Sequence, residues 1–173
     1  MALLPHSIIQ DEVTTFKQEA LEKFGSGHAL RSPPHITLLP PFRSNQTDFS
    51  ALQAFASTQQ LIEVALSNFD RFGTRVIFVN VLAEQSLTDC QQRLSTFCAE
   101  QFAIPSDPRP FHPHMTVAFK DLKKAVFPQA WAYFSEKTYE RLFTATAITL
   151  LIHTGQRWEI QEEFPFDHPK PLV

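Results

Sequence analysis

Glycine is scarce in this chain, which has only 4 among its 173 residues. Gly25 and Gly27 are followed by Leu30 at the place where a dinucleotide-binding fingerprint needs its third glycine. No Gly-Lys pair is present that could belong to a phosphate-binding loop. The sequence therefore argues against a nucleotide cofactor held by a glycine-rich loop.

An excess of positive charge is also lacking. The chain has 15 Lys and Arg against 18 Asp and Glu, a formal net charge of −3. A protein with this balance has no general positive field with which to hold long nucleic acid by counterion release. We therefore expect no DNA partner, whereas a short anionic ligand held by a few local groups is compatible with the composition.

Long apolar runs and paired cysteines are missing as well. No run approaches the roughly 18 apolar residues that a membrane helix needs. The first residues contain no basic region, and Pro5 and His6 interrupt their apolar run, so we expect no signal peptide, no membrane partner and a cytoplasmic protein. Cys90 and Cys98 lie eight residues apart on an expected helix, about 12 Å along its axis, too far for a disulfide.

The chain contains ample material for a packed core. Hydrophobic residues make up 43% of it, and 17 residues are Phe. The length suits one domain, and no linker rich in Gly, Ser or Pro divides it. We therefore expect a single two-lobed domain over residues 1–173.

Hydrophobic periodicity and turn residues predict eleven alternating elements. Strands are expected at residues 2–4, 35–39, 62–72, 75–82, 114–119, 139–153 and 157–164, and helices at 11–24, 48–60, 86–102 and 122–135. Gly73 and Thr74 form the expected turn between two strands, and Thr154 and Gly155 that of a closing hairpin. The short connections favour antiparallel pairing and an α+β fold over a doubly wound parallel sheet.

The most informative feature is a motif that occurs twice. Residues 34–38 read Pro-His-Ile-Thr-Leu, and residues 113–117, 79 positions later, read Pro-His-Met-Thr-Val. Because successive side chains of a strand point to opposite faces, His35 and Thr37 share one face, and so do His114 and Thr116. Each motif strand therefore has an apolar face for the core and a polar face that carries an imidazole beside a hydroxyl.

Two such strands facing each other suit phosphodiester chemistry without a metal ion. A neutral imidazole can take a proton from attacking water while a protonated one delivers a proton to the departing oxygen. Histidine is the side chain whose ordinary pKa lets both forms coexist near neutral pH. Hydroxyl groups of the threonines would stabilise the charge that develops on the phosphate oxygens.

These residues resemble a known family. Residues 33–38, Pro-Pro-His-Ile-Thr-Leu, and 111–119, Phe-His-Pro-His-Met-Thr-Val-Ala-Phe, are similar to the two signatures of the two-histidine (2H) phosphoesterase superfamily. The branch that they resemble most is that of the 2'-5' RNA ligase-like proteins and cyclic phosphodiesterases. The resemblance covers nearly the whole chain, because the separation of the motifs, the order of the elements and the closing hairpin also agree.

The resemblance implies a fold, an activity and a site. It implies two pseudo-symmetric βαββ-type lobes with antiparallel sheets around a central cleft, and cofactor-free hydrolysis of 2',3'-cyclic or related phosphodiesters. His35 and His114 would be the acid and the base, in that order if the frequent assignment in relatives applies. Thr37 and Thr116 would bind the phosphate.

Residues that follow the motif strands are further candidates for contact with a substrate. Phe42 follows the first strand and Phe119 ends the second, and a nucleobase can stack on such a ring, although core packing is the commoner role of phenylalanine. Arg43 and Lys120 come one residue later and can place positive charge near a phosphate, although solvated surface charge is the commoner role.

The other histidines carry no motif. His112 forms a His-x-His pair with His114, but no neighbouring carboxylate or cysteine completes a metal site, so we expect no metal and place His112 at the rim of the cleft. His6, His28, His153 and His168 receive no role.

Three hypotheses about function follow. The first is a metal-independent phosphodiesterase acting on an RNA end or a small nucleotide that carries a cyclic phosphate. The second is an RNA-end binding or 2'-5' ligation-related module without significant hydrolysis, and the third is a catalytically idle domain. The four motif residues suit a cyclic phosphate on RNA, an ADP-ribose cyclic phosphate, a 2'-5' oligonucleotide and a tRNA fragment equally well, so we expect loops such as 25–34 and 103–113 to select the substrate.

Overall fold

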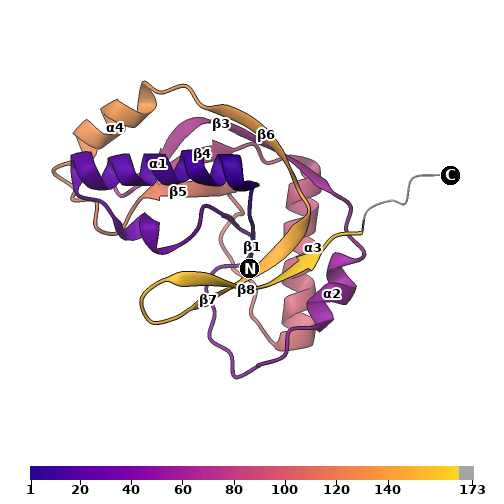
Figure 1. The fold of residues 1–173 in the computed structure, drawn as a ribbon. Helices are drawn as coiled ribbons and strands as arrows, with labels where there is room; N and C mark the ends of the chain where they lie inside the picture. The colour runs from indigo at the N-terminus through magenta and orange to yellow at the C-terminus, as the bar shows by residue number, and fades with distance from the viewer. Residues whose placement is uncertain (168–173) are drawn as a thin grey trace.

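Two four-stranded antiparallel sheets form the framework of the computed structural model, which describes residues 1–167 (Figure 1). The strand order is β2-β1-β7-β8 in the first sheet and β5-β4-β3-β6 in the second. The first consists of β1 (Ala2–Leu3), β2 (Ile36–Thr37), β7 (Ala147–His153) and β8 (Trp158–Pro165). The second consists of β3 (Ile62–Phe72), β4 (Val76–Val81), β5 (His114–Ala118) and β6 (Glu140–Ala145). The predicted α+β class with antiparallel sheets is confirmed. His168 lies outside the described residues.

Within residues 1–167, four α-helices and one short 3-10 helix cover the sheets. They are α1 (Ser7–Phe24), η1 (His28–Arg31), α2 (Ala51–Ala56), α3 (Gln85–Phe102) and α4 (Phe127–Ser135). Helices α1 and α4 lie side by side along the second sheet, where α1 contacts β5 and α4 contacts β3 (Figure 1). Helices α2 and α3 contact each other at the other end of the molecule. None of the helices within residues 1–167 has the length and apolar composition needed to cross a membrane.

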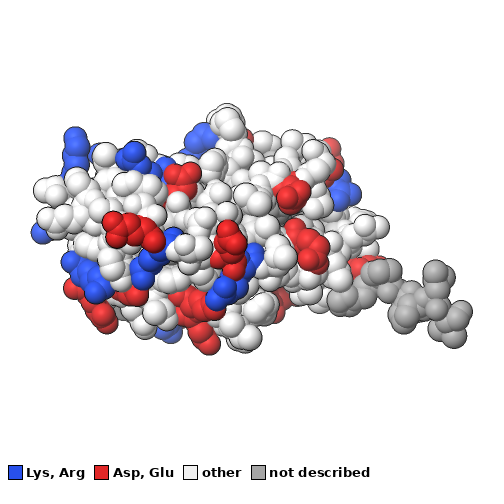
Figure 2. All heavy atoms as spheres, turned by 90° about the horizontal axis from the view of Figure 1, so that it is seen from above, with Lys and Arg blue, Asp and Glu red and all other residues white. Residues whose placement is uncertain are grey.

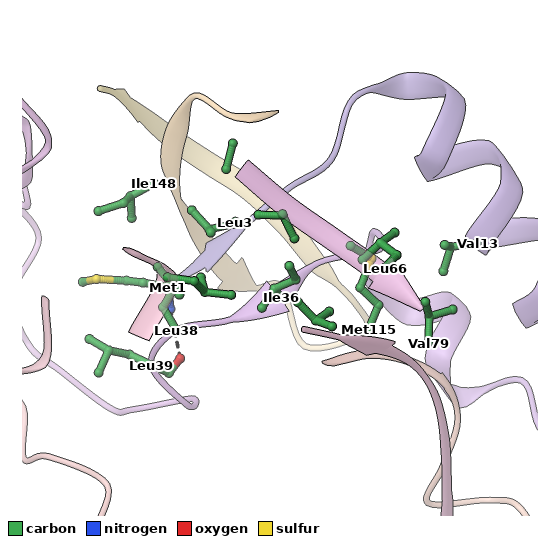
Figure 3. Close-up of a cluster of buried hydrophobic side chains, with 14 of the residues drawn as sticks. Met1, Leu3, Val13, Ile36, Leu38, Leu39, Leu66, Val79, Met115 and Ile148 are labelled. Carbon is green, nitrogen blue, oxygen red and sulfur yellow. Dashed lines mark hydrogen bonds between the residues drawn. The ribbon is translucent and has the colours of Figure 1, made fainter. Parts of the chain in front are cut away.

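The apolar faces of the two motif strands meet in one core. Ile36 behind the first motif and Met115 behind the second are both fully buried, as the period of two predicts. Figure 3 shows Leu3 and Ile36 of the first sheet in the same cluster as Leu66 and Met115 of the second. Because this cluster is shared by both sheets, the polar faces of the motif strands are held by a common packed base.

The prediction of one long strand over residues 139–153 is wrong. This stretch is divided between β6, which pairs with β3 in the second sheet, and β7, which pairs with β1 and β8 in the first. The division falls at Thr146, within a run that has neither glycine nor proline to mark a turn. The first sheet is therefore built from both ends of the chain, and the two sheets do not correspond to its N-terminal and C-terminal halves.

Three helix boundaries also differ from their predicted positions. Helix α1 begins at Ser7, one turn earlier than predicted. Helix α2 is shorter than residues 48–60, because the Asp48 carboxylate accepts the backbone N–H of Ser50 (2.8 Å) in a turn before the helix. Helix α4 begins at Phe127 and not at residue 122, because Pro128 has no N–H to donate and fits only in the first turn.

Charge is mixed over the surface seen in Figure 2, where Lys and Arg are interspersed with Asp and Glu. No broad field of one sign covers this face. On this face, therefore, only a local arrangement of side chains could attract an anionic ligand.

Candidate active site

A cavity of about 1400 Å³ opens beside the first sheet and is lined by segments that lie far apart in the sequence. His35 and Thr37 line it from β2 and the residue before it, and Thr116 lines it from β5. Strands β2 and β5 belong to different sheets and contact each other at this point. The structure thus brings three of the four motif residues to one cavity. His114 is not among the residues that line it.

Both motif histidines are oriented by the same backbone contact. Nδ1 of His35 lies 2.7 Å from the carbonyl oxygen of Pro33, and Nδ1 of His114 lies 2.7 Å from that of His112. Because a carbonyl oxygen only accepts hydrogen bonds, each Nδ1 must carry the hydrogen. Nε2 is then the free acceptor of each neutral ring, which is the state that a general base requires.

The two rings differ in their surroundings. The ring of His114 packs against the rings of Phe72 and Phe78, with centroid distances of 4.9 and 5.0 Å. Burial lowers the pKa of His114 below its ordinary value. The pKa of His35 is lowered to about 4, chiefly by burial and to a smaller extent by the charges of Lys17, of the Met1 amino group and of His114. His35 directly precedes β2 and His114 begins β5, and these two strands contact each other.

The four residues weighed as further ligands all line the cavity. Phe42 and Arg43 line it from the segment after β2, and Phe119 and Lys120 from the segment after β5. The ring of Phe119 also packs edge-on against the ring of His28, at a centroid distance of 5.1 Å. His112, expected at the rim, is exposed but does not line the cavity, because its ring packs against that of Phe72 (5.0 Å).

Several lining residues were not predicted from the sequence. Lys17 comes from α1, His28 and Arg31 from η1, and His153 and Trp158 from the β7–β8 hairpin. A signal for Lys17 was present, since it continues the four-residue spacing of Ile9 and Val13 along the buried face of α1. The others carried no local signal, because their position depends on how η1 and the hairpin pack beside β2.

The lining of the cavity is basic and, within residues 1–167, contains no carboxylate. It includes four Lys or Arg residues and three histidines, but no Asp or Glu, although the chain as a whole has a net charge of −3. The basic residues are Lys17, His28, Arg31, His35, Arg43, Lys120 and His153. Cations in a concave site raise the local concentration of anionic ligands. The arrangement therefore favours an anion in this cavity.

Asp121 joins the two parts of the chain that carry the motifs. Its carboxylate accepts hydrogen bonds from the Ser26 hydroxyl (2.8 Å) and from the backbone N–H groups of Gly27 (3.1 Å) and His28 (2.8 Å). The preceding residue, Lys120, has a φ of 63°, in the left-handed region that non-glycine residues rarely adopt. Asp121 thus connects the segment after β5 to the segment before β2 and helps to position Lys120 and His28 at the cavity.

Within residues 1–167, no group of three or more His, Cys, Asp or Glu side chains is arranged to hold a metal ion. The imidazoles and hydroxyls at the cavity are instead groups that exchange protons and donate hydrogen bonds. Aromatic rings at the same cavity, among them Phe42, Phe119 and Trp158, offer apolar surfaces beside these polar groups.

Known proteins are similar to this chain in sequence or in fold. Two proteins of Staphylococcus epidermidis, each bearing the name "Putative phosphoesterase", are 28% identical to this chain over 124 residues. The match covers 68% of this chain and 68% of each relative. TT0787 of Thermus thermophilus superposes with a TM-score of 0.61 at 20% identity, covering 96% of this chain and 97% of that one. LigT of E. coli superposes with a TM-score of 0.62 at 14% identity, covering 96% and 95%. The family model of the 2'-5' RNA ligase superfamily matches residues 5–157, and the chain therefore belongs to this superfamily.

Proposed function

We propose that the protein is a metal-independent phosphodiesterase that hydrolyses 2',3'-cyclic or related phosphodiesters of RNA ends or small nucleotides. The observation that carries the proposal is the basic cavity, free of lining carboxylates, at which His35, Thr37 and Thr116 meet. Membership of the superfamily and the phosphoesterase names of two relatives support the same reaction class.

The proposed reaction is a single displacement at phosphorus. A neutral imidazole accepts through Nε2 a proton of the water that attacks the phosphorus atom. The bond from phosphorus to one ribose oxygen breaks, and the protonated second imidazole donates its proton to that oxygen. The product is a ribose phosphomonoester, and exchange with solvent restores the protonation states. Hydrogen bonds from Thr37 and Thr116 stabilise the charge on the other phosphate oxygens.

Electrostatics distinguish the two histidines. The positive charge of Lys17 acts on His35, whereas the neighbouring charge that lowers the pKa of His114 is that of His112. A nearby cation disfavours the protonated imidazole. We therefore propose His35 as the base and His114 as the acid, the reverse of the order that the family resemblance implies.

The cavity also has room and surfaces for the nucleoside. Its volume of about 1400 Å³ exceeds what a cyclic phosphate alone would fill. Phe42, Phe119 and Trp158 line it, and bases stack on aromatic rings with little sequence preference. These features support a nucleotide or the end of an RNA as the substrate.

The test is incubation of the protein with 2',3'-cyclic mononucleotides and with a short RNA that ends in a 2',3'-cyclic phosphate, in the presence of EDTA. We expect turnover to a monoester of one regiochemistry, resolved as the 2'- or 3'-phosphate by chromatography. The doubly substituted His35→Ala/His114→Ala protein is the control for contaminating nucleases. Loss of turnover in EDTA with recovery on added Zn²⁺ or Mn²⁺ would exclude the mechanism. Tight binding of the RNA end without hydrolysis would favour an RNA-end binding module.

A further inference from the structure

Lys17 is a charged residue on an otherwise apolar helix face. The buried residues of α1 are Ile9, Val13, Lys17 and Ala20, which follow one another at helical spacing on the side that packs against the protein. Only 2% of the surface of Lys17 is exposed. A lysine is almost never buried to this extent unless a partner balances its charge.

The structure contains no such balancing charge. The Lys17 ammonium donates one hydrogen bond, to the carbonyl oxygen of Ser32 at 2.9 Å. No carboxylate of residues 1–167 lies within salt-bridge distance of its Nζ atom. An ammonium group has three hydrogen-bond donors, so two of them have no partner within the described chain.

Two other basic side chains at the same helix have carboxylate partners. Arg141 binds the Glu12 carboxylate (2.6 Å), and Lys137 binds that of Glu19 (3.2 Å). Both of these cations are more exposed than Lys17. The cation that loses the most hydration is thus the one without a carboxylate. A role limited to holding Ser32 does not explain this, since a neutral side chain can donate to a carbonyl at a lower desolvation cost.

Lys17 borders the cavity at the motif of the first sheet. Lys17, Ser32, His35 and Thr37 all line the cavity, and the charge of Lys17 acts on the His35 ring. A phosphate held by His35 and Thr37 would therefore bring negative charge to the cavity that Lys17 also lines.

We propose that Lys17 is a phosphate-binding residue, whose amino group takes up a proton as a tetrahedral anion enters the cavity and then donates hydrogen bonds to that anion. The proposal deepens the proposed function, because it names the group that recognises the charge of the substrate. It does not require turnover, since a non-reactive anion should bind in the same way.

Proton uptake follows from the surroundings of the amino group. Burial lowers the pKa of Lys17 to about 7, so the amine is mostly neutral at pH 8. A bound dianion favours the charged form and raises this pKa. The Met1 amino group before β1 and His114 on β5 act, like Lys17, on His35 beside β2. The 3-10 helix η1, which contacts α1, brings His28 and Arg31 to the same cavity. Since the pKa of His35 is about 4, a proton bound at pH 8 belongs to Lys17 and not to this ring.

The test is an NMR titration of protein labelled with ¹³Cε-lysine, with sulfate as the probe because sulfate has no proton to exchange in this pH range. The resonance of Lys17 is the one that disappears in Lys17→Met. In the free protein we expect its midpoint near pH 7, and in saturating sulfate about one unit or more higher. An unchanged midpoint in sulfate would overturn the proposal even if the protein hydrolyses cyclic phosphates.

Sulfate affinity at pH 7 provides an independent measurement. Lys17→Met should bind sulfate at least about tenfold more weakly, because a charge-assisted hydrogen bond is lost. Lys23→Met is the matched control, since Lys23 is on the same helix but exposed and outside the cavity. Circular dichroism establishes that both variants are folded. Equal sulfate affinity in folded Lys17→Met and in the wild type would contradict the proposal, whatever the outcome of the activity assays.

Discussion

Each of the two motifs carries a histidine and a threonine, but the surroundings of these side chains differ. At the first motif, β2 has only two residues, pairs with β1 alone, and has its histidine at the cavity near Lys17. At the second motif, β5 has five residues, pairs with β4, and has its histidine packed against two phenylalanine rings. The Nδ1 contact with a carbonyl is the same at both motifs, at 2.7 Å.

This difference indicates how a repeated motif can perform two unlike tasks. The backbone contact of each ring leaves Nε2 free on both histidines, which makes either ring competent for proton transfer. The neighbouring charge then decides which ring gives up its proton more readily. A duplicated local geometry thus provides the two groups, and the asymmetric packing around them separates their roles.

The largest expected effect is that of removing either imidazole. His35→Ala and His114→Ala should each reduce kcat for a 2',3'-cyclic nucleotide by about 1000-fold or more, and the double variant should lose little beyond this because both act in one step. Steady-state kinetics with the exposed His6→Ala as the control measures this. Near wild-type turnover in either single variant would show that the two strands do not act as a pair.

A substrate with a better leaving group distinguishes the acid from the base. A p-nitrophenyl phosphodiester of a nucleoside needs little protonation of its leaving group, so it should tolerate loss of the acid but not of the base. With His114 as the acid, His114→Ala should lose at least about tenfold less activity on this substrate than on the cyclic nucleotide, while His35→Ala loses similar activity on both. The opposite pattern would assign His35 as the acid.

The threonines should matter less than the histidines. Thr37→Ala and Thr116→Ala each remove one hydrogen-bond donor to the phosphate, so we expect about 10- to 100-fold losses in kcat/KM. Thr37→Ser and Thr116→Ser, which keep the hydroxyl, are the matched controls and should recover most of the activity. If the serine variants are as impaired as the alanine variants, the hydroxyls are not the relevant groups.

The connection between the two motif regions should have a smaller effect. Asp121→Ala removes the carboxylate that accepts hydrogen bonds from Ser26, Gly27 and His28. The segment that carries His28 at the cavity should then be held less firmly. We expect KM to rise about three- to tenfold with kcat less affected. Asp121→Asn keeps one acceptor oxygen and should change KM less. A change in kcat alone would argue against a positioning role for Asp121.

The smallest effect concerns pH. The profile of kcat/KM should be bell-shaped, with an acidic limb near the His35 pKa of about 4 and an alkaline limb below the ordinary histidine value of 6.5, because burial lowers the pKa of His114. In Lys17→Met the pKa of His35 should rise, since a cation that disfavours its protonation is gone. The acidic limb should therefore move upward by roughly half a unit while the alkaline limb stays. Parallel movement of both limbs would mean that Lys17 does not act on His35 alone.

Local sequence patterns predicted the bounds of a strand well where alternating residues are followed by a turn residue. The bounds of β3 were predicted correctly, because its residues alternate and the turn residue Gly73 follows it. The stretch 139–153 was not, because β6 and β7 are both strands by local preference and differ only in the sheet that they join. Strand preference depends on the residue itself, whereas sheet membership depends on partners distant in the sequence.

Some features of the candidate site could likewise be predicted from local sequence, and others could not. The sequence by itself determined that each histidine shares a strand face with a threonine, because side chains alternate along any extended chain. It also determined that Ile36 and Met115 point to the core. The packing of His114 against Phe72 and Phe78 depends on the tertiary structure. So does the cavity to which α1 brings Lys17 and to which η1 and the β7–β8 hairpin contribute further residues. The physical reason is that burial, desolvation and neighbouring charge arise from contacts between elements, and no single segment of the sequence contains them.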